Sequence, residues 1–70
     1  MNRIQEHALA MLSGEWQRLP DLSARWQMPD GPILALEDLV EYGQAERQIV
    51  PVYRGTHQAG CRIYYRRRAA

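Results

Sequence analysis

The sequence predicts an α+β domain in which three short helices precede a two-stranded β-hairpin. Apolar residues recur at helical spacing over the first 43 residues. Two groups of β-branched and aromatic residues follow, at 49–53 and 63–65. The polar segment 54–60 between them contains two glycines and has the composition of a turn. A chain of 70 residues accommodates one domain, spanning 1–70, with one small core.

The first helix is expected to begin after Asn2. The Asn2 side chain is suited to cap the helix, and Gln5 is placed to complete a capping box. One apolar stripe follows at helical spacing, and it consists of Ile4, Ala8, Met11 and Leu12. Ser13 and Gly14 are expected to end the helix, because glycine adopts the left-handed conformation at low cost.

A short extended stretch at 16–19 is expected before the second helix, with the possibility of a third strand there. Pro20 and an acid open the second helix, and two prolines within 27–32 end it. Trp16 and Trp26 are expected in the core, because the chain has no phenylalanine and needs large side chains at its centre.

The third helix is expected from Pro32 to Tyr42, with Gly43 as its stop. Its apolar face is expected to carry Ile33, Leu36, Val40 and Gly43, with Leu39 beside this face. Its opposite, solvated side is expected to carry Glu37, Asp38 and Glu41.

The hairpin follows. Pro51 indicates an edge position or a bulge in the first strand. Tyr64 and Tyr65 are adjacent, so one should face the core and the other solvent. Residues 66–70 form a basic tail that is expected to fray at its end.

Charge is divided unevenly along the chain. Residues 1–44 hold three arginines and seven acids, a net charge of −4, whereas residues 45–70 hold six arginines and one acid, a net charge of +5. A basic segment of this kind predicts a polyanionic partner, and the alternative is a solvated surface. All nine cations are arginines, whose planar guanidinium groups match phosphates and guanine edges.

The expected order of elements resembles the winged helix-turn-helix superfamily of DNA-binding domains, especially the small bacterial and phage transcription regulators. Residues 21–28 look like the first helix of a helix-turn-helix with its turn, 35–43 like the end of a recognition helix, and 44–47 like the approach to the first wing strand. The layout is also similar to the winged-helix accessory protein of ferrous-iron transport. The wing of that protein carries several cysteines, where this chain has Cys61 alone.

The resemblance implies a DNA-binding transcriptional regulator that contacts double-stranded DNA through its wing and tail. The residues it assigns to the DNA interface are Arg47, Arg54, Thr56, His57, Gln58, Arg62, Arg66, Arg67 and Arg68. Winged-helix dimers often use a further helix after the wing. No such helix is expected here, so a monomer or weak dimer is expected.

The third helix departs from the family pattern. Its outward positions are expected near Leu34, Asp38 and Glu41, whereas a helix that reads the major groove usually offers Arg, Asn, Gln, Ser or Thr. Three arrangements remain open: reading of DNA mainly by the wing, insertion of only the first turn of this helix, or no DNA binding. In the last case these three residues would dock a protein partner, and the chain would be an accessory or adaptor module.

Other chemistry has little support. No Ser-His-Asp set or phosphate-binding glycine loop is present, so neither an enzyme nor a cofactor is expected. His57 and Cys61 are four residues apart, but His7 is the only other histidine, so no metal site is expected. No apolar run approaches the ~18 residues of a membrane span. Glu6 comes too early for a secretory signal, and a cytoplasmic protein is expected.

Overall fold

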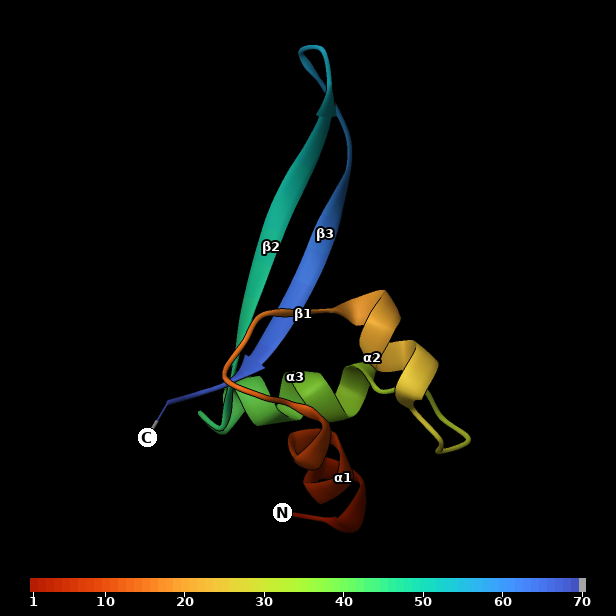
Figure 1. The fold of residues 1–70 in the computed structure, drawn as a ribbon, viewed down its shortest axis with the longest axis vertical. Helices are drawn as coiled ribbons and strands as arrows, with labels where there is room; N and C mark the ends of the chain where they lie inside the picture. Colours follow the sequence, from red (N-terminus) through yellow and green to blue (C-terminus); the bar gives the residue numbers. More distant parts are fainter. Residues whose placement is uncertain (70) are drawn as a thin grey trace.

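The computed structural model describes residues 1–69 and shows an α+β domain with three helices and a three-stranded antiparallel sheet. The elements in chain order are α1 (Arg3–Met11), β1 (Gln17–Arg18), α2 (Leu19–Arg25), α3 (Ile33–Glu41), β2 (Ala45–Arg54) and β3 (His57–Arg67). The helices gather at one end of the molecule, and the β2–β3 hairpin projects away from them (Figure 1). The three helices, the hairpin and the short strand within 16–19 are therefore confirmed.

The start of α1 is as predicted and its end is not. The Gln5 amide donates to Oδ1 of Asn2 at 2.8 Å, and the Asn2 amide donates to Oε1 of Gln5 at 3.0 Å, which completes the capping box. The helix ends at Met11 because Leu12 turns to an extended conformation. Gly14 gives no left-handed cap, since its φ is not positive.

Helices α2 and α3 begin and end close to their predicted positions. Pro20 lies in the first turn of α2, and Gly43, with φ of +76°, follows the end of α3 in the left-handed conformation. The apolar face of α3 differs from the prediction, because Ile33 is 52% exposed. The face is centred on the fully buried Leu39, and at 100° per residue Ile33 lies about 120° away around the helix axis.

The sheet has β3 at its centre, in the order β1-β3-β2. Strand β1 pairs with β3 only at Gln17–Tyr65 and Arg18–Tyr64, whereas β2 pairs with β3 along its whole length. Pro51 therefore lies on an edge strand, as predicted.

The turn of the hairpin is shorter than the predicted segment 54–60. It consists of Gly55 and Thr56, with Gly55 at φ +62°, and the remaining residues from His57 onward belong to β3. A β-bulge shifts the register between Val52 and Tyr53, because Val52 pairs with Gly60 and Tyr53 pairs with Gln58. The small residues at 59–60 therefore remain within β3.

The core lies between the helices and one face of the sheet. Its buried apolar residues are Ala8, Leu12, Leu22, Ala35, Leu36, Leu39, Ala45 and Tyr65. Tyr65 is 1% exposed and Tyr64 is half-buried on the opposite face, so the predicted division between the two tyrosines is confirmed in direction. Trp16 is 37% exposed and is not a core residue, and Trp26 is only partly buried. Tyr65 supplies the large side chain that the tryptophans were expected to provide.

Backbone hydrogen bonds hold the first part of the basic tail against the domain. The Arg67 amide donates to the carbonyl of Ser13 at 2.7 Å, and the Arg68 amide donates to the carbonyl of Gln44 at 3.1 Å. Residues 66–68 are therefore anchored to the domain, whereas Ala70, at the end of the tail where fraying was predicted, lies outside the described residues. None of the helices within residues 1–69 is long and apolar enough to cross a membrane.

Candidate nucleic-acid interface

The outer part of the hairpin forms a two-stranded arm beyond the helices. Strand β1 ends at the pair Arg18–Tyr64, so among the described strands β3 pairs with β2 alone from Ile63 to the tip. We call residues 48–63 the ribbon. It extends along the long axis of a molecule that measures 43 × 29 × 18 Å (Figure 1).

Several residues assigned to DNA binding from the sequence come together on this ribbon. The tip carries Arg54, Thr56, His57 and Gln58, and all four are exposed. Arg62 is also exposed and lies nearer the base of the ribbon. These side chains supply guanidinium, hydroxyl, imidazole and amide groups, all of which bind phosphates or base edges in protein–DNA complexes.

Arg47 belongs to a different environment. Its guanidinium forms an ion pair with Glu37 on α3, on the side of the sheet that faces the helices. Arg47 therefore joins β2 to α3, and its charge is balanced within the domain.

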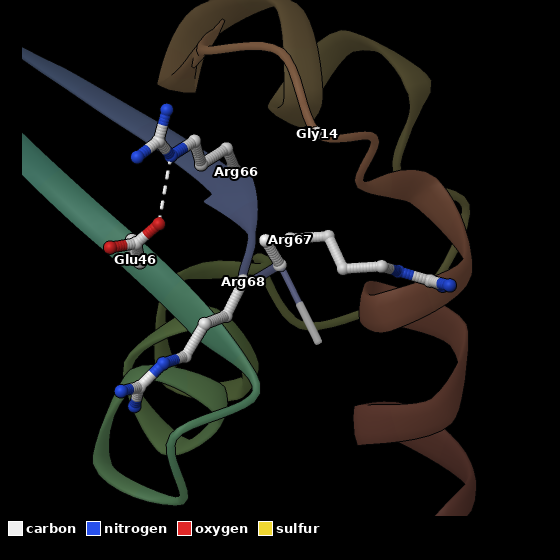
Figure 2. Close-up of a pocket in the computed structure, with 6 residues that line it drawn as sticks. Gly14, Glu46, Arg66, Arg67 and Arg68 are labelled. Carbon is white, nitrogen blue, oxygen red and sulfur yellow. Dashed lines mark hydrogen bonds and ion pairs between the residues drawn. The ribbon is translucent and has the colours of Figure 1, made fainter.

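The three arginines of the tail point in different directions (Figure 2). Nε of Arg66 donates to Oε1 of Glu46 at 2.8 Å, and the Arg66 guanidinium lies 4.3 Å from the centre of the Trp16 ring. Nη2 of Arg67 donates to the carbonyl of Leu9 at 2.7 Å, near the end of α1. A guanidinium nitrogen of Arg68 lies 3.3 Å from the position that a Cβ atom on Gly43 would take.

The tail arginines border a common hollow without converging on it. The hollow has a volume of about 410 Å³ and is lined by Gly14, Glu46, Arg66, Arg67, Arg68 and Ala69. Because Arg66 turns to Glu46 and Arg67 turns to α1, the three guanidinium groups do not form one cradle for an anion (Figure 2).

The ribbon arginines form no ion pair with any of residues 1–69. Within residues 1–69 the ion pairs are Arg47–Glu37 and Arg66–Glu46, so Arg54 and Arg62 have no acidic partner among the described side chains. The sequence alone does not indicate which of the six C-terminal arginines are paired within the domain, because their partners come from other strands and from the helices.

Arg18 is a basic residue of this region that sequence reasoning missed. Its pairing with Tyr64 places it on the sheet face that points away from the helices. We call this the outer sheet face, and its residues include Trp16, Arg18, Glu46, Gln48, Arg62, Tyr64 and Arg66. The signal in the sequence was the short extended stretch before Pro20, which becomes a third strand.

The alternative docking surface on α3 is only partly formed as expected. Leu34 is 79% exposed and Glu41 is exposed. Asp38 does not point outward: it is half-buried, and its Oδ2 accepts a hydrogen bond of 3.0 Å from Nε2 of Gln5 on α1. The side of α3 that carries Asp38 packs against α1, which is why the outward expectation is wrong for this residue.

Apolar side chains accompany Leu34 at the first turn of α3. Ile33 and Ile4 are 52% and 45% exposed. They border a hollow of about 390 Å³ that is lined by Ile4, Asp30, Gly31, Ile33, Leu34 and Ala35.

In the part of the chain that the structure describes, no group of three or more His, Cys, Asp and Glu side chains is arranged to hold a metal ion, and Cys61 is a free, exposed thiol. Comparisons with protein-family models, curated proteins and solved structures gave no significant match to the chain.

Proposed function

We propose that this chain is a winged-helix protein that binds double-stranded DNA through the ribbon and thereby regulates transcription. The observation that carries this function is the projecting ribbon with Arg54 and Arg62 unpaired among residues 1–69. The order of three helices, a two-residue strand and a long hairpin is compatible with a winged helix, in which the hairpin is the wing.

The charge of the ribbon favours a polyanion. Residues 48–63 contain two arginines and no acid, whereas the helices carry most of the acids. A two-stranded ribbon also has dimensions that the major groove of DNA admits. The exposed Thr56 and Gln58 at the tip supply hydrogen-bond donors that reach phosphates or base edges.

Helix α3 has a secondary part in this binding mode. Its exposed surface offers Leu34 and Glu41 and no cation, so phosphates would be repelled rather than bound there. The ribbon therefore makes the main contacts, and recognition by α3 in the major groove is not required.

A titration of a mixed-sequence DNA duplex by fluorescence anisotropy tests this function. The intact chain should bind, with an affinity that falls steeply between about 50 and 200 mM salt. Arg54→Ala and Arg62→Ala should each weaken binding and reduce the slope of log K against log salt by about 0.9.

Arg3→Ala is the matched control, because Arg3 is an exposed arginine on α1 and its loss changes the net charge equally. The function is contradicted if the intact chain does not bind at low salt, or if Arg3→Ala weakens binding as much as the ribbon variants do.

The exposed apolar residues of α3 favour a second candidate, a protein-interaction module. Leu34, Ile33 and Ile4 form an apolar surface at one end of the helical layer. If this surface is the functional one, Leu34→Glu abolishes binding of a co-purifying protein, and the ribbon variants leave that binding unchanged.

A further inference from the structure

We infer that Arg18 on β1 and Arg62 on β3 form a phosphate-binding site on the outer sheet face. This inference rests on the proposed function, in which the phosphate belongs to a DNA backbone. It adds Arg18, a residue of the helical end of the molecule, to an interface otherwise confined to the ribbon.

The pairing of the strands brings these two arginines together. Arg18 lies opposite Tyr64, and Arg62 precedes Tyr64 by two residues in β3, so the side chains of Arg18 and Arg62 belong to the same face. Diagonal neighbours of this kind are about 7–8 Å apart between Cα atoms, within reach of long side chains. Arg18 and Arg62 line one hollow of about 180 Å³, together with Leu19, Pro20, Cys61 and Ile63.

The hollow lies at the end of β1, where the edge of β3 is no longer paired with that strand. Because α2 begins at Leu19, the chain turns away from β3 directly after Arg18. The edge of β3 at residues 61–63 is therefore not covered by β1. A ligand can approach the two guanidinium groups from solvent without displacing a strand.

The electrostatics of the pair favour an anion. Arg18 and Arg62 are both exposed, and neither forms an ion pair within residues 1–69. Glu15 and Asp21 each lie three positions from Arg18 in the sequence, and neither is paired with Arg18 or Arg62. Two like charges on neighbouring positions repel each other, and a bound phosphate would replace that repulsion with two attractive, directional contacts.

The position of the pair also fits a backbone that follows the ribbon. Arg62 and the tip residue His57 are five residues apart, which is about 16 Å along a strand at 3.3 Å per residue. That distance corresponds to about five base pairs at 3.4 Å each. One DNA strand could therefore contact Arg54 at the tip and the Arg18–Arg62 pair at the base.

The first experiment measures DNA binding by Arg18→Ala, with Arg3→Ala as the control for net charge. Arg18→Ala should raise Kd about tenfold and make the dependence of affinity on salt less steep. If Arg18 and Arg62 bind one phosphate, the double variant should lose less affinity than the product of the two single losses. An Arg18→Ala affinity equal to that of Arg3→Ala overturns the inference, even when Arg54→Ala supports the proposed function.

The second experiment separates failure of the site from failure of the proposed function. Inorganic phosphate is titrated into the isotope-labelled protein, and the amide resonances of Arg18 and Arg62 are followed by NMR. Shifts at both residues without DNA binding support the site and assign it to a free phosphate, which contradicts the proposed function. No shift, together with no loss of DNA affinity on substitution, overturns the site. Arg18→Gln, which keeps a long polar side chain, replaces Arg18→Ala if circular dichroism shows that the alanine variant is unfolded.

Discussion

The phenol hydroxyl of Tyr65 donates a hydrogen bond of 2.6 Å to Oε1 of Glu37 and thereby joins the central strand β3 to α3. The other carboxylate oxygen of Glu37 binds Arg47 on β2, so one side chain of α3 contacts two strands. The hydrogen bond from Tyr65, followed by that from Arg47, lowers the pKa of Glu37. Burial, and then the bond to Glu37, raises the pKa of Tyr65. The predicted solvated side of α3 is therefore wrong at Glu37.

Removing the Tyr65 hydroxyl should weaken the contact between α3 and the sheet. We expect Tyr65→Phe to lower the free energy of unfolding by about 1 kcal/mol, since Glu37 is exposed enough for water to replace part of the bond. Urea denaturation measures the change. Tyr64→Phe is the control, because Tyr64 lies on the opposite face of the sheet, and equal losses in the two variants would contradict this role.

Stability should fall on acidification because of Glu37. Its folded-state pKa is lower than the ordinary 4.5, so folding favours the carboxylate. The resulting stabilisation is present above the unfolded-state pKa and is lost as the pH falls through the folded-state pKa. Glu37→Gln should therefore reduce the loss of stability below about pH 4.5 in denaturation series at several pH values. Glu41→Gln, at an exposed position of α3 that forms no ion pair with the described residues, is the control for the loss of one carboxylate.

The ends of helices could be predicted where the residues that determine them lie close together in the sequence. Asn2 and Gln5 are three residues apart and predict the start of α1, and Gly43 predicts the end of α3. The turn was predicted too long because residues 57–60 are small or polar, and composition alone does not indicate that such residues can remain paired in a strand.

Contacts between distant residues could not be predicted in the same way. Tyr65 and Glu37 are 28 positions apart, and Gln5 and Asp38 are 33 apart. Arg66 has a cross-strand acid and an aromatic ring beside it only because β1 and β2 flank β3. The sequence therefore indicated a basic C-terminal segment correctly, but not which of its arginines remain available to a ligand.

Leu36 should be essential for the core. Its side chain is fully buried among the three helices and the sheet. Leu36→Ala should lower the free energy of unfolding by about 2–5 kcal/mol, enough to unfold a domain of this size. Leu34→Ala, at a position that is 79% exposed, should change it by less than about 0.5 kcal/mol. Thermal melts of both variants test the pair, and similar melting temperatures would show that the core face of α3 is misplaced.

Arg67 should contribute to stability rather than to DNA affinity, although the sequence assigned it to the DNA interface. Its guanidinium donates to the Leu9 carbonyl at 2.7 Å, in the last turn of α1, where the helix dipole favours a cation. Arg67→Ala should lower the free energy of unfolding by about 0.5–1 kcal/mol, which corresponds to about 2–8 °C in Tm for a domain of this length.

Arg54→Ala should lower DNA affinity and leave stability unchanged, since Arg54 is exposed at the tip of the ribbon and forms no ion pair with the described residues. Its Tm should equal that of the parent while its DNA affinity falls. Thermal melts and anisotropy titrations on both variants separate the two roles, because both substitutions remove one positive charge from the C-terminal segment. If Arg67→Ala leaves Tm unchanged and weakens DNA binding as much as Arg54→Ala, the guanidinium of Arg67 leaves α1 to bind DNA, and the tail belongs to the interface.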